Sequence, residues 1–157
     1  MVVHFKKADV SDSKKILKMQ VESFLLLLDK YKDYDTNPAC ETLQKVKSRF
    51  DCKNIDHYFI CLGDKKIGYI RIVCLDSDVY RLSQMFILPR FCGNGYAQDA
   101  IKQIELLYHN AQKWTLDTIK QENNLCYLYE KMGYRFVGVK ESIKDGMDLV
   151  YYEKIIF

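Results

Sequence analysis

The sequence of 157 residues is long enough for one domain with a buried core, and its 48% hydrophobic and 29% charged residues are typical of a globular protein. The net charge of +3 is small and both signs are spread along the chain, which argues against a nucleic-acid partner. No uninterrupted apolar run is longer than residues 24–28 and the first residues lack a signal-peptide core, so we expect a soluble, cytoplasmic protein with no membrane partner.

The first predicted elements are a strand and a long helix. Residues 2–6 have the composition of a short strand, and apolar residues recur at helical spacing between Ile16 and Leu28. Leu26 and Leu27 widen the apolar stripe near the end of this helix beyond an ordinary core-facing stripe. We therefore expect something more than the core to cover these two leucines, either a bound acceptor or a second subunit.

A second helix and a three-stranded meander follow. Asn37 followed by Pro38 is a typical helix start and predicts a helix that runs to about residue 50. Residues 57–62, 66–74 and 79–88 are rich in isoleucine, valine, tyrosine and phenylalanine, and turn residues separate them. Short turns between consecutive strands favour an antiparallel arrangement.

The last third of the chain alternates helices and strands. Residues 97–111 and 125–132 each have apolar residues on one face of a helix, and residues 113–118 between them form a short strand. Residues 134–139 and 147–155 have strand composition around a Lys-Asp-Gly turn. The order β-α-α-β-β-β-α-β-α-β-β, without a linker or a repeat, predicts a single α+β domain over residues 1–157.

The cysteines and histidines lack the spacing of metal ligands. No pair of cysteines is spaced as C-x-x-C, and several lie in apolar, strand-like runs. We interpret them as reduced, mostly buried thiols of a cytosolic protein and expect no metal site. These residues are Cys40, Cys52, Cys61, Cys74, Cys92 and Cys126, together with His4, His57 and His109.

The segment that indicates chemistry lies between the third strand of the meander and the following helix. Residues 87–97 read Ile-Leu-Pro-Arg-Phe-Cys-Gly-Asn-Gly-Tyr-Ala, with Gly93 and Gly95 directly before the helix. Glycines allow successive N–H groups to turn toward one point, and a helix N-terminus adds about half a positive charge. Together these features suit a phosphate or pyrophosphate group.

A G-x-G turn can serve several purposes. It can simply start a helix without binding a ligand. A dinucleotide-binding fingerprint requires a third small residue where Gln98 stands and a parallel strand context, whereas the preceding strands are expected to be antiparallel. A P-loop requires Gly-Lys-Ser/Thr, which is absent. The remaining alternative is a loop for the pyrophosphate of coenzyme A.

At this point the chain resembles the GCN5-related N-acetyltransferase (GNAT) superfamily, whose signature is a strand, often a proline, then Gln/Arg-x-x-Gly-x-Gly/Ala and a helix. Arg90, Gly93 and Gly95 match this spacing, although Cys92 stands where many members have an arginine. The resemblance implies acetyl-CoA as co-substrate and a three-layer fold with a mixed, mostly antiparallel sheet of six to seven strands and about four helices. It also implies a coenzyme site made by the strand end and the loop: Phe86, Ile87, Leu88, Cys92, Gly93, Asn94, Gly95, Tyr96 and Ala97.

A second match lies in residues 121–134, where Tyr-Glu-Lys-Met-Gly-Tyr resembles the end of a later helix of the family. The resemblance implies that Tyr129 is the general acid that protonates the leaving thiolate, since a phenol with a pKa near 10 keeps its proton at neutral pH. The residues alone favour a core tyrosine on the apolar face of its helix. Asn123 and Asn124 stand near the position of the family's asparagine and are predicted to contact the coenzyme.

The sequence does not identify a general base. Many members of the family carry a glutamate on the strand before the loop, but residues 80–88 contain no carboxylate. The alternatives are water or a residue elsewhere, although we interpret each such residue first as a surface or capping group. These residues are Glu22, Asp35, His57 and Asp76.

The resemblance places the acceptor under the first two helices and their connection. Leu27, Tyr31 and Tyr34 would suit an amine with apolar or aromatic bulk, and the acids Asp33 and Asp35 would attract its charge. The expected reaction is acetyl transfer from acetyl-CoA to a primary amine of a small molecule or peptide, by a monomer or homodimer. The alternatives are a catalytically silent acyl-CoA-binding module and an enzyme that acts on protein N-termini or lysines.

Overall fold

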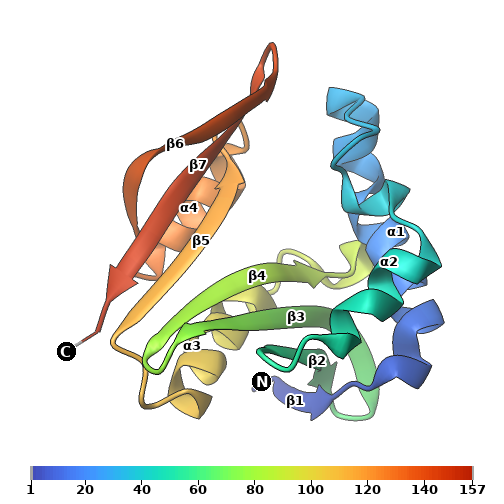
Figure 1. Ribbon diagram of the computed structural model, residues 1–157, viewed down its shortest axis with the longest axis vertical. Coiled ribbons are helices and arrows are strands. Elements are labelled where there is room, and N and C mark those ends of the chain that lie inside the picture. The colour runs from blue at the N-terminus through green and yellow to red at the C-terminus, as the bar shows by residue number, and fades with distance from the viewer. Residues whose placement is uncertain (1, 157) are drawn as a thin grey trace.

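A seven-stranded sheet with helices on both faces forms the computed structural model, which describes residues 2–156 (Figure 1). The strands are β1 (His4–Lys7), β2 (Ile55–Leu62), β3 (Lys65–Asp76), β4 (Val79–Ile87), β5 (Lys113–Ile119), β6 (Arg135–Lys144) and β7 (Met147–Ile155). The α-helices are α1 (Ser13–Tyr31), α2 (Leu43–Ser48), α3 (Tyr96–Leu107) and α4 (Asn123–Lys131). The predicted three-layer α+β fold with a mixed, mostly antiparallel sheet is confirmed.

Two hydrophobic cores lie on opposite faces of the sheet. On one face Ile16 of α1 packs with Phe59 of β2, and on the other Ile101 of α3 packs with Ile60 of the same strand. Because neighbouring residues of a strand point to opposite faces, α1 and α2 cover one face and α3 covers the other. Tyr129 of α4 belongs to the core on the α3 side.

The second predicted helix is wrong as a single element. Asn37 caps a turn as expected, but this turn is a short 3-10 helix (Pro38–Cys40), and the chain becomes extended at Glu41 with a ψ of 152°. Thr42 then starts α2 by accepting a backbone N–H at 3.1 Å. The physical reason for the break is the side chain of Glu41, which turns inward to pair with Arg49.

Strands β4 and β5 pair over only a short distance. β4 pairs with β3 in an antiparallel ladder along its length, but its parallel pairing with β5 joins residues 79–81 to residues 113–115 only. Beyond this point the two strands part, and Figure 1 shows them as the arms of a wide V. Among the strands of the described chain, none pairs with residues 82–87 on this side. We call the region between these arms the fork.

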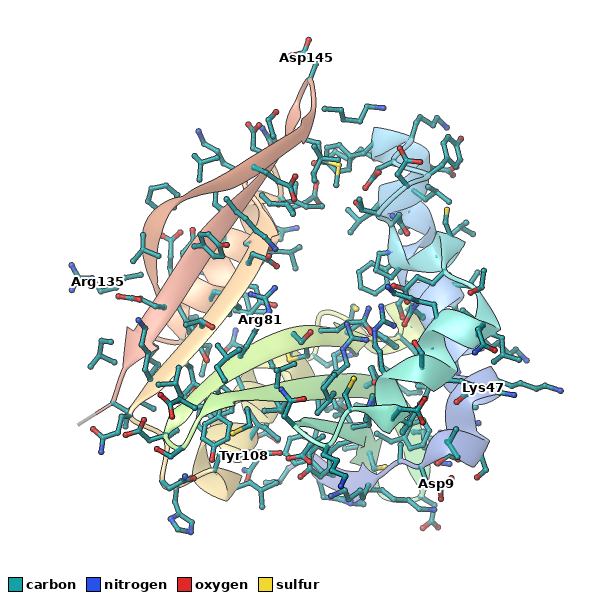
Figure 2. All side chains as sticks on the ribbon, viewed as in Figure 1. Asp9, Lys47, Arg81, Tyr108, Arg135 and Asp145 are labelled. Atoms are coloured by element: carbon teal, nitrogen blue, oxygen red, sulfur yellow. The ribbon has the colours of Figure 1, made fainter. Side chains whose placement is uncertain are left out.

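Ion pairs join three strands near the apex of the fork. Asp117 of β5 lies 3.0 Å from Arg81 of β4 and 2.6 Å from Lys140 of β6. Figure 2 labels Arg81, which lies close to the point where β4 and β5 part. Partial burial alone would raise the pKa of Asp117, but the two cations lower it below its usual value. An ionised carboxylate therefore holds the strands together where the sheet opens.

We predict that Asp117→Asn lowers the free energy of unfolding by about 1–3 kcal/mol at neutral pH, because it leaves two partly buried cations without their counter-charge. A carboxylate with a lowered folded-state pKa stabilises the fold above its unfolded pKa of about 3.9, and this contribution is lost as the pH falls through the folded-state value. Urea unfolding at pH 7 and at pH 3 measures the difference.

The matched control is Glu153→Gln, which removes a more exposed pair with Lys113 at 3.0 Å. We expect this control to change stability by less than about 1 kcal/mol. A loss for Asp117→Asn that is equally large at both pH values would contradict an ionic origin.

Candidate functional site

The glycine loop between β4 and α3 presents free backbone N–H groups at the open end of the fork. A 3-10 turn (Pro89–Phe91) leads to Gly93 and Gly95, whose φ angles are 83° and 80°. A Cβ at either glycine would meet no atom within 4 Å, and residues 92–95 are exposed. Within residues 2–156, no backbone hydrogen bond uses an N–H of residues 93–98. These donors therefore have no backbone partner in the described part of the chain.

The free donors coincide with the first turn of α3. The first paired N–H is that of Asp99, which donates to the carbonyl oxygen of Gly95 at 3.1 Å. Cys92 does not belong to the free set, because its N–H donates to the carbonyl oxygen of Pro89 at 3.1 Å. The glycine loop and the positive end of the helix together form an anion site that begins at Gly93.

At the end of β4, the backbone N–H and C=O groups of every second residue point into the fork. The N–H of Leu88 donates to the carbonyl oxygen of Ile67 at 2.8 Å, so Leu88 and Phe86 are hydrogen-bonded to β3. The residues between them, Met85 and Ile87, point their N–H and C=O groups away from β3. Of the predicted strand residues, only Ile87 thus has backbone groups free for a ligand. The sequence analysis missed Met85, because composition does not reveal which residues of a strand are hydrogen-bonded to the neighbouring strand.

Tyr129 lies on the other arm of the fork, in the core on the α3 side. Its ring centroid is 6.0 Å from that of Tyr134. Its hydroxyl makes no hydrogen bond within residues 2–156, yet it is not fully enclosed. Burial first, and then the negative charge of Asp117, raise the pKa of Tyr129 to about 12. The phenol therefore keeps its proton through the physiological range, which a proton donor requires.

The start of α4 places the two predicted asparagines away from Tyr129. Asn123 and Asn124 are exposed in the first turn of the helix. At about 100° per residue, Asn124 lies about 140° around the helix from Tyr129. The structure therefore does not bring either asparagine onto the face that carries Tyr129.

Glu122 is a site residue that the sequence analysis missed. It precedes Tyr129 by two helical turns, so the two residues share a face within about 20°. Its carboxylate accepts hydrogen bonds from Lys30 at 2.6 Å and from the hydroxyl of Tyr31. Partial burial alone would raise the pKa of Glu122, but these two hydrogen bonds lower it. The end of α1 is therefore tied to the start of α4 across the open end of the fork.

The predicted acceptor residues differ in their surroundings. Tyr31 is bound to Glu122, Leu27 is half-buried, and Tyr34 is 63% exposed. Asp33 is buried, but its carboxylate accepts the N–H of Thr36 at 3.1 Å and so shapes the turn after α1. Of these residues, Leu27 and Tyr31 lie on the last turns of α1, close to the contact with α4.

The candidate bases have structural roles. Glu22 is exposed and pairs with Arg90 at 2.6 Å, and Asp76 is the last residue of β3, opposite Val79 at the far end of β4. Asp35 is exposed in the turn after α1. His57 is buried and stacks on Phe50 at 3.9 Å, and burial lowers its pKa to about 4. These surroundings favour a surface role for Glu22, Asp35 and Asp76, whereas His57 is part of the core.

The six cysteines are all free thiols, but the prediction that most are buried is wrong. Only Cys61 is buried, whereas Cys40, Cys52 and Cys92 are exposed because they lie in turns and loops rather than inside strands. No group of three side chains that could hold a metal ion occurs within residues 2–156. No helix in that same range is both long and apolar enough to cross a bilayer.

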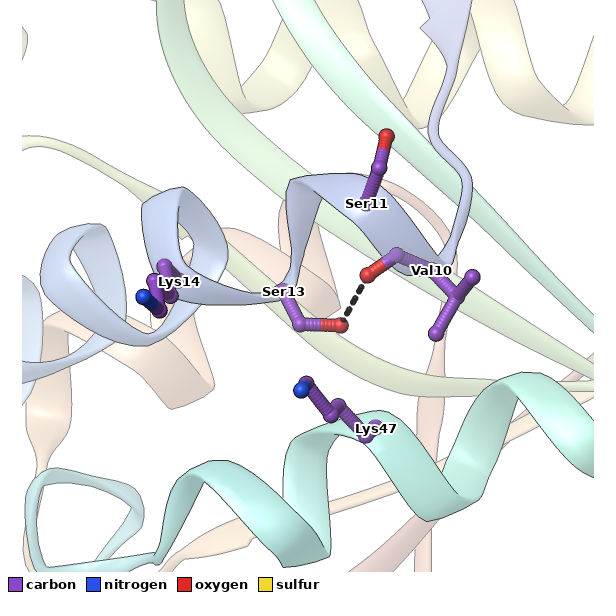
Figure 3. A pocket seen from close by; sticks show the side chains of 5 residues that line it. All are labelled: Val10, Ser11, Ser13, Lys14 and Lys47. Atoms are coloured by element: carbon purple, nitrogen blue, oxygen red, sulfur yellow. Dashed lines mark hydrogen bonds between the residues drawn. The ribbon is translucent and has the colours of Figure 1, made fainter.

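Two surface pockets lie outside the fork. One lies between the start of α1 and α2, and Figure 3 shows the hydroxyl of Ser13 donating to the carbonyl oxygen of Val10 there, at 2.7 Å. Its other lining residues are Ser11, Lys14 and Lys47. The second pocket adjoins the glycine loop and is mostly basic. It is lined by Lys15, Asp64, Lys65, Lys66, Arg90 and Phe91.

Known structures of similar fold are acetyltransferases. An acetyltransferase from Thermus thermophilus has a TM-score of 0.79 at 13% identity, covering 99% of this chain and 98% of its own. A spermidine N-acetyltransferase chimera from Vibrio cholerae and hSSAT has a TM-score of 0.79 at 15% identity, covering 99% and 96%. PaiA N-acetyltransferase from Thermoplasma acidophilum, in complex with coenzyme A, has a TM-score of 0.71 at 14% identity, covering 99% and 100%.

Sequence comparison gives the family directly. A search among curated proteins found no significant match. The family model described as "Acetyltransferase (GNAT) domain" matches residues 30–156, which is most of the chain. The glycine loop, the parted strands and this match lead to one conclusion: the protein belongs to the GNAT family of acetyltransferases.

Proposed function

We propose that the protein transfers the acetyl group of acetyl-CoA to a primary amine of a small molecule or peptide. The observation that carries this proposal is the set of free N–H donors of residues 93–98 at the N-terminus of α3. A diphosphate is the ligand that such a convergent set of amides suits best. The similar PaiA structure holds coenzyme A, which carries this group.

The coenzyme fits the fork in two parts. The amides after Gly93 hold the pyrophosphate, where a missing Cβ leaves the approach open. The free backbone groups of Met85 and Ile87 pair with the amides of the pantetheine arm, which then takes the place of a neighbouring strand. The six free thiols fit a cytoplasmic location.

The chemistry requires an attacking amine, a stabilised oxyanion and a proton for the leaving group. The neutral amine attacks the thioester carbonyl, and a backbone N–H at the end of β4 donates to the oxyanion that forms. The tetrahedral intermediate then breaks its C–S bond, and Tyr129 gives its proton to the thiolate. Water takes the proton that the amine loses and returns a proton to Tyr129, which restores the phenol. The contact of Glu122 with α1 borders the side from which the amine enters.

We predict that Gly95→Glu abolishes binding of coenzyme A, because it puts a side chain and a negative charge over the amides. Gly146→Glu is a matched control, since both glycines have a φ of 80° and open space where a Cβ would lie. The two variants should lose similar stability from the left-handed backbone, about 1 kcal/mol. Calorimetry with coenzyme A and thermal unfolding of both variants measure the two effects.

Coenzyme binding that survives in Gly95→Glu would contradict the assignment of the loop. Equal loss of binding in Gly146→Glu would show that folding, rather than the site, is affected.

We predict that Tyr129→Phe lowers kcat by about 10²-fold or more and leaves the Kd for acetyl-CoA unchanged, because it removes only the proton donor. Tyr127→Phe is the control in the same helix, since Tyr127 is 67% exposed, and it should keep its kcat. Thiol release from acetyl-CoA over a panel of amines measures turnover. A kcat in Tyr129→Phe equal to that of the wild type, with chemistry rate-limiting, would remove Tyr129 from this role.

The same assay tests the proposed function itself. Turnover with at least one amine is the expected result. Tight binding of acetyl-CoA without thiol release for every amine in the panel would instead identify a catalytically silent acyl-CoA-binding module.

A further inference from the structure

A row of polar side chains crosses the face of the sheet under α1 and α2 and ends at the fork. His57 of β2 is opposite Arg71 of β3, which is opposite Gln84 of β4. Directly opposed residues of a ladder share one face of the sheet. Gln84 is the last residue of the row, because within residues 2–156 no strand pairs with β4 beyond residue 81 on its other side. The row therefore leads from the α1 core to the edge of the fork.

Arg71 carries a buried charge that lacks its own partner. The residue is 8% exposed, and among residues 2–156 no carboxylate lies within 4.0 Å of its guanidinium. Its Nε donates to the hydroxyl of Ser83 at 3.3 Å. The hydroxyl of Tyr69 also lies beside the guanidinium and interacts with it, but within the described chain no carboxylate pairs with its terminal nitrogens, and neither nitrogen is fully enclosed. These nitrogens are recessed donors without a carboxylate of their own.

The nearest acid cannot balance this charge alone. The negative charge of Glu41 favours the charged form of Arg71, but the two side chains form no direct ion pair. The carboxylate of Glu41 already accepts a hydrogen bond from Nη1 of Arg49 at 2.8 Å and a second one from Nη2. The buried guanidinium of Arg71 and the partly buried one of Arg49 therefore share one carboxylate. Arginine does not give up its proton in proteins, so one positive charge stays without balance. Burying such a charge is costly unless an anion pairs with it.

The other neighbours of Arg71 are neutral. Burial lowers the pKa of His57 to about 4 and raises the pKa of Tyr69 to about 12. The two side chains are joined by a hydrogen bond of 2.6 Å between His57 Nδ1 and the Tyr69 hydroxyl. At neutral pH the imidazole and the phenol are both uncharged. Arg71 therefore faces a neighbourhood with an excess of one positive charge.

Two features of β4 prepare a place for a ligand beside Arg71. Ser83 is an extra residue in the ladder, since Leu82 and Gln84 face consecutive residues of β3, and this bulge brings its hydroxyl to Arg71. Gln84 is 8% exposed, and its Oε1 has no hydrogen-bond partner within residues 2–156. A buried carbonyl oxygen of this kind is normally bonded, so it favours an N–H donor at the edge of the fork.

We infer that Arg71 binds a carboxylate of the acceptor and that Gln84 accepts a hydrogen bond from the acceptor's amine, so that the substrate is an amino acid or a similar small amino carboxylate. This inference rests on the proposed function and names its substrate class. A single unbalanced guanidinium matches a singly charged carboxylate, with which it forms two parallel hydrogen bonds. β3 is about 4.8 Å from β4, so the amine and the carboxylate are a few bonds apart. The same positive charge disfavours a polyamine.

The test compares amino acids with their decarboxylated amines, for example leucine with isoamylamine and phenylalanine with phenethylamine, and includes spermidine. The wild type should prefer the amino acid in each pair by about 10–100-fold in kcat/KM, which is the range for a hydrogen-bonded charge pair. Arg71→Met should remove this preference and leave the KM for acetyl-CoA unchanged. Arg71→Lys, which keeps the charge but loses the bidentate geometry, should keep part of it.

A stability comparison separates ligand binding from a structural role. Arg71→Met should unfold at the same temperature as the wild type or a higher one, because it removes a buried charge without a partner. Arg49→Met is the matched control and should unfold at a lower temperature, since it takes away the direct partner of Glu41. An equal decrease in unfolding temperature in both variants would show that Arg71 stabilises the charge of Glu41, and would overturn the inference.

A binding experiment separates failure of the inference from failure of the proposed function. N-acetylleucine should bind the wild type but not Arg71→Met in calorimetry with coenzyme A present. Acetylation of amines without preference for a carboxylate would overturn the inference and leave the function standing. Binding of N-acetylleucine that depends on Arg71, without turnover of any amine, would overturn the function and leave the carboxylate site standing.

Discussion

The parting of β4 from β5 is the constraint on which the rest of the site depends. A parallel ladder that stops after residue 81 leaves one edge of β4 without a strand neighbour in the middle of the sheet, among the residues that the structure describes. Backbone N–H and C=O groups in such a place need another partner. The fork therefore offers a ligand the hydrogen bonds that a strand would otherwise make, and the glycine loop at its end adds free amides for an anion.

Charged groups lie at the apex of the fork, at its open end and between the two. At the apex, the carboxylate of Asp117 is matched by two cations. At the open end, Glu122 joins α1 to α4 through Lys30 and Tyr31. The unbalanced guanidinium of Arg71 lies between them, opposite Gln84 of β4, and the positive N-terminus of α3 lies at the open end. Both unbalanced positions favour anions, so a coenzyme and an acidic acceptor can occupy the site together.

The sequence allowed prediction of the features that depend on local pattern. The order of elements followed from hydrophobic periodicity, and the loop followed from Gly93 and Gly95, whose positive φ angles only glycine adopts easily. The features that depend on contacts distant in sequence could not be predicted. Glu41 breaks the second helix because it pairs with Arg49. The hydrogen-bonding pattern between β3 and β4 decides that the backbone groups of Met85, and not those of Phe86, point into the fork. Arg71 was missed because its lack of a partner exists only in the folded chain.

The central claim is that specific backbone amides of β4 and the loop bind the coenzyme. Amide chemical shifts measured by NMR during titration with coenzyme A test it residue by residue. We expect the largest changes at Met85, Ile87 and residues 93–97, and small changes at Phe86 and Leu88, whose N–H groups are already bonded to β3. Shift changes of equal size along the whole strand, or none in the loop at millimolar coenzyme A, would contradict the account.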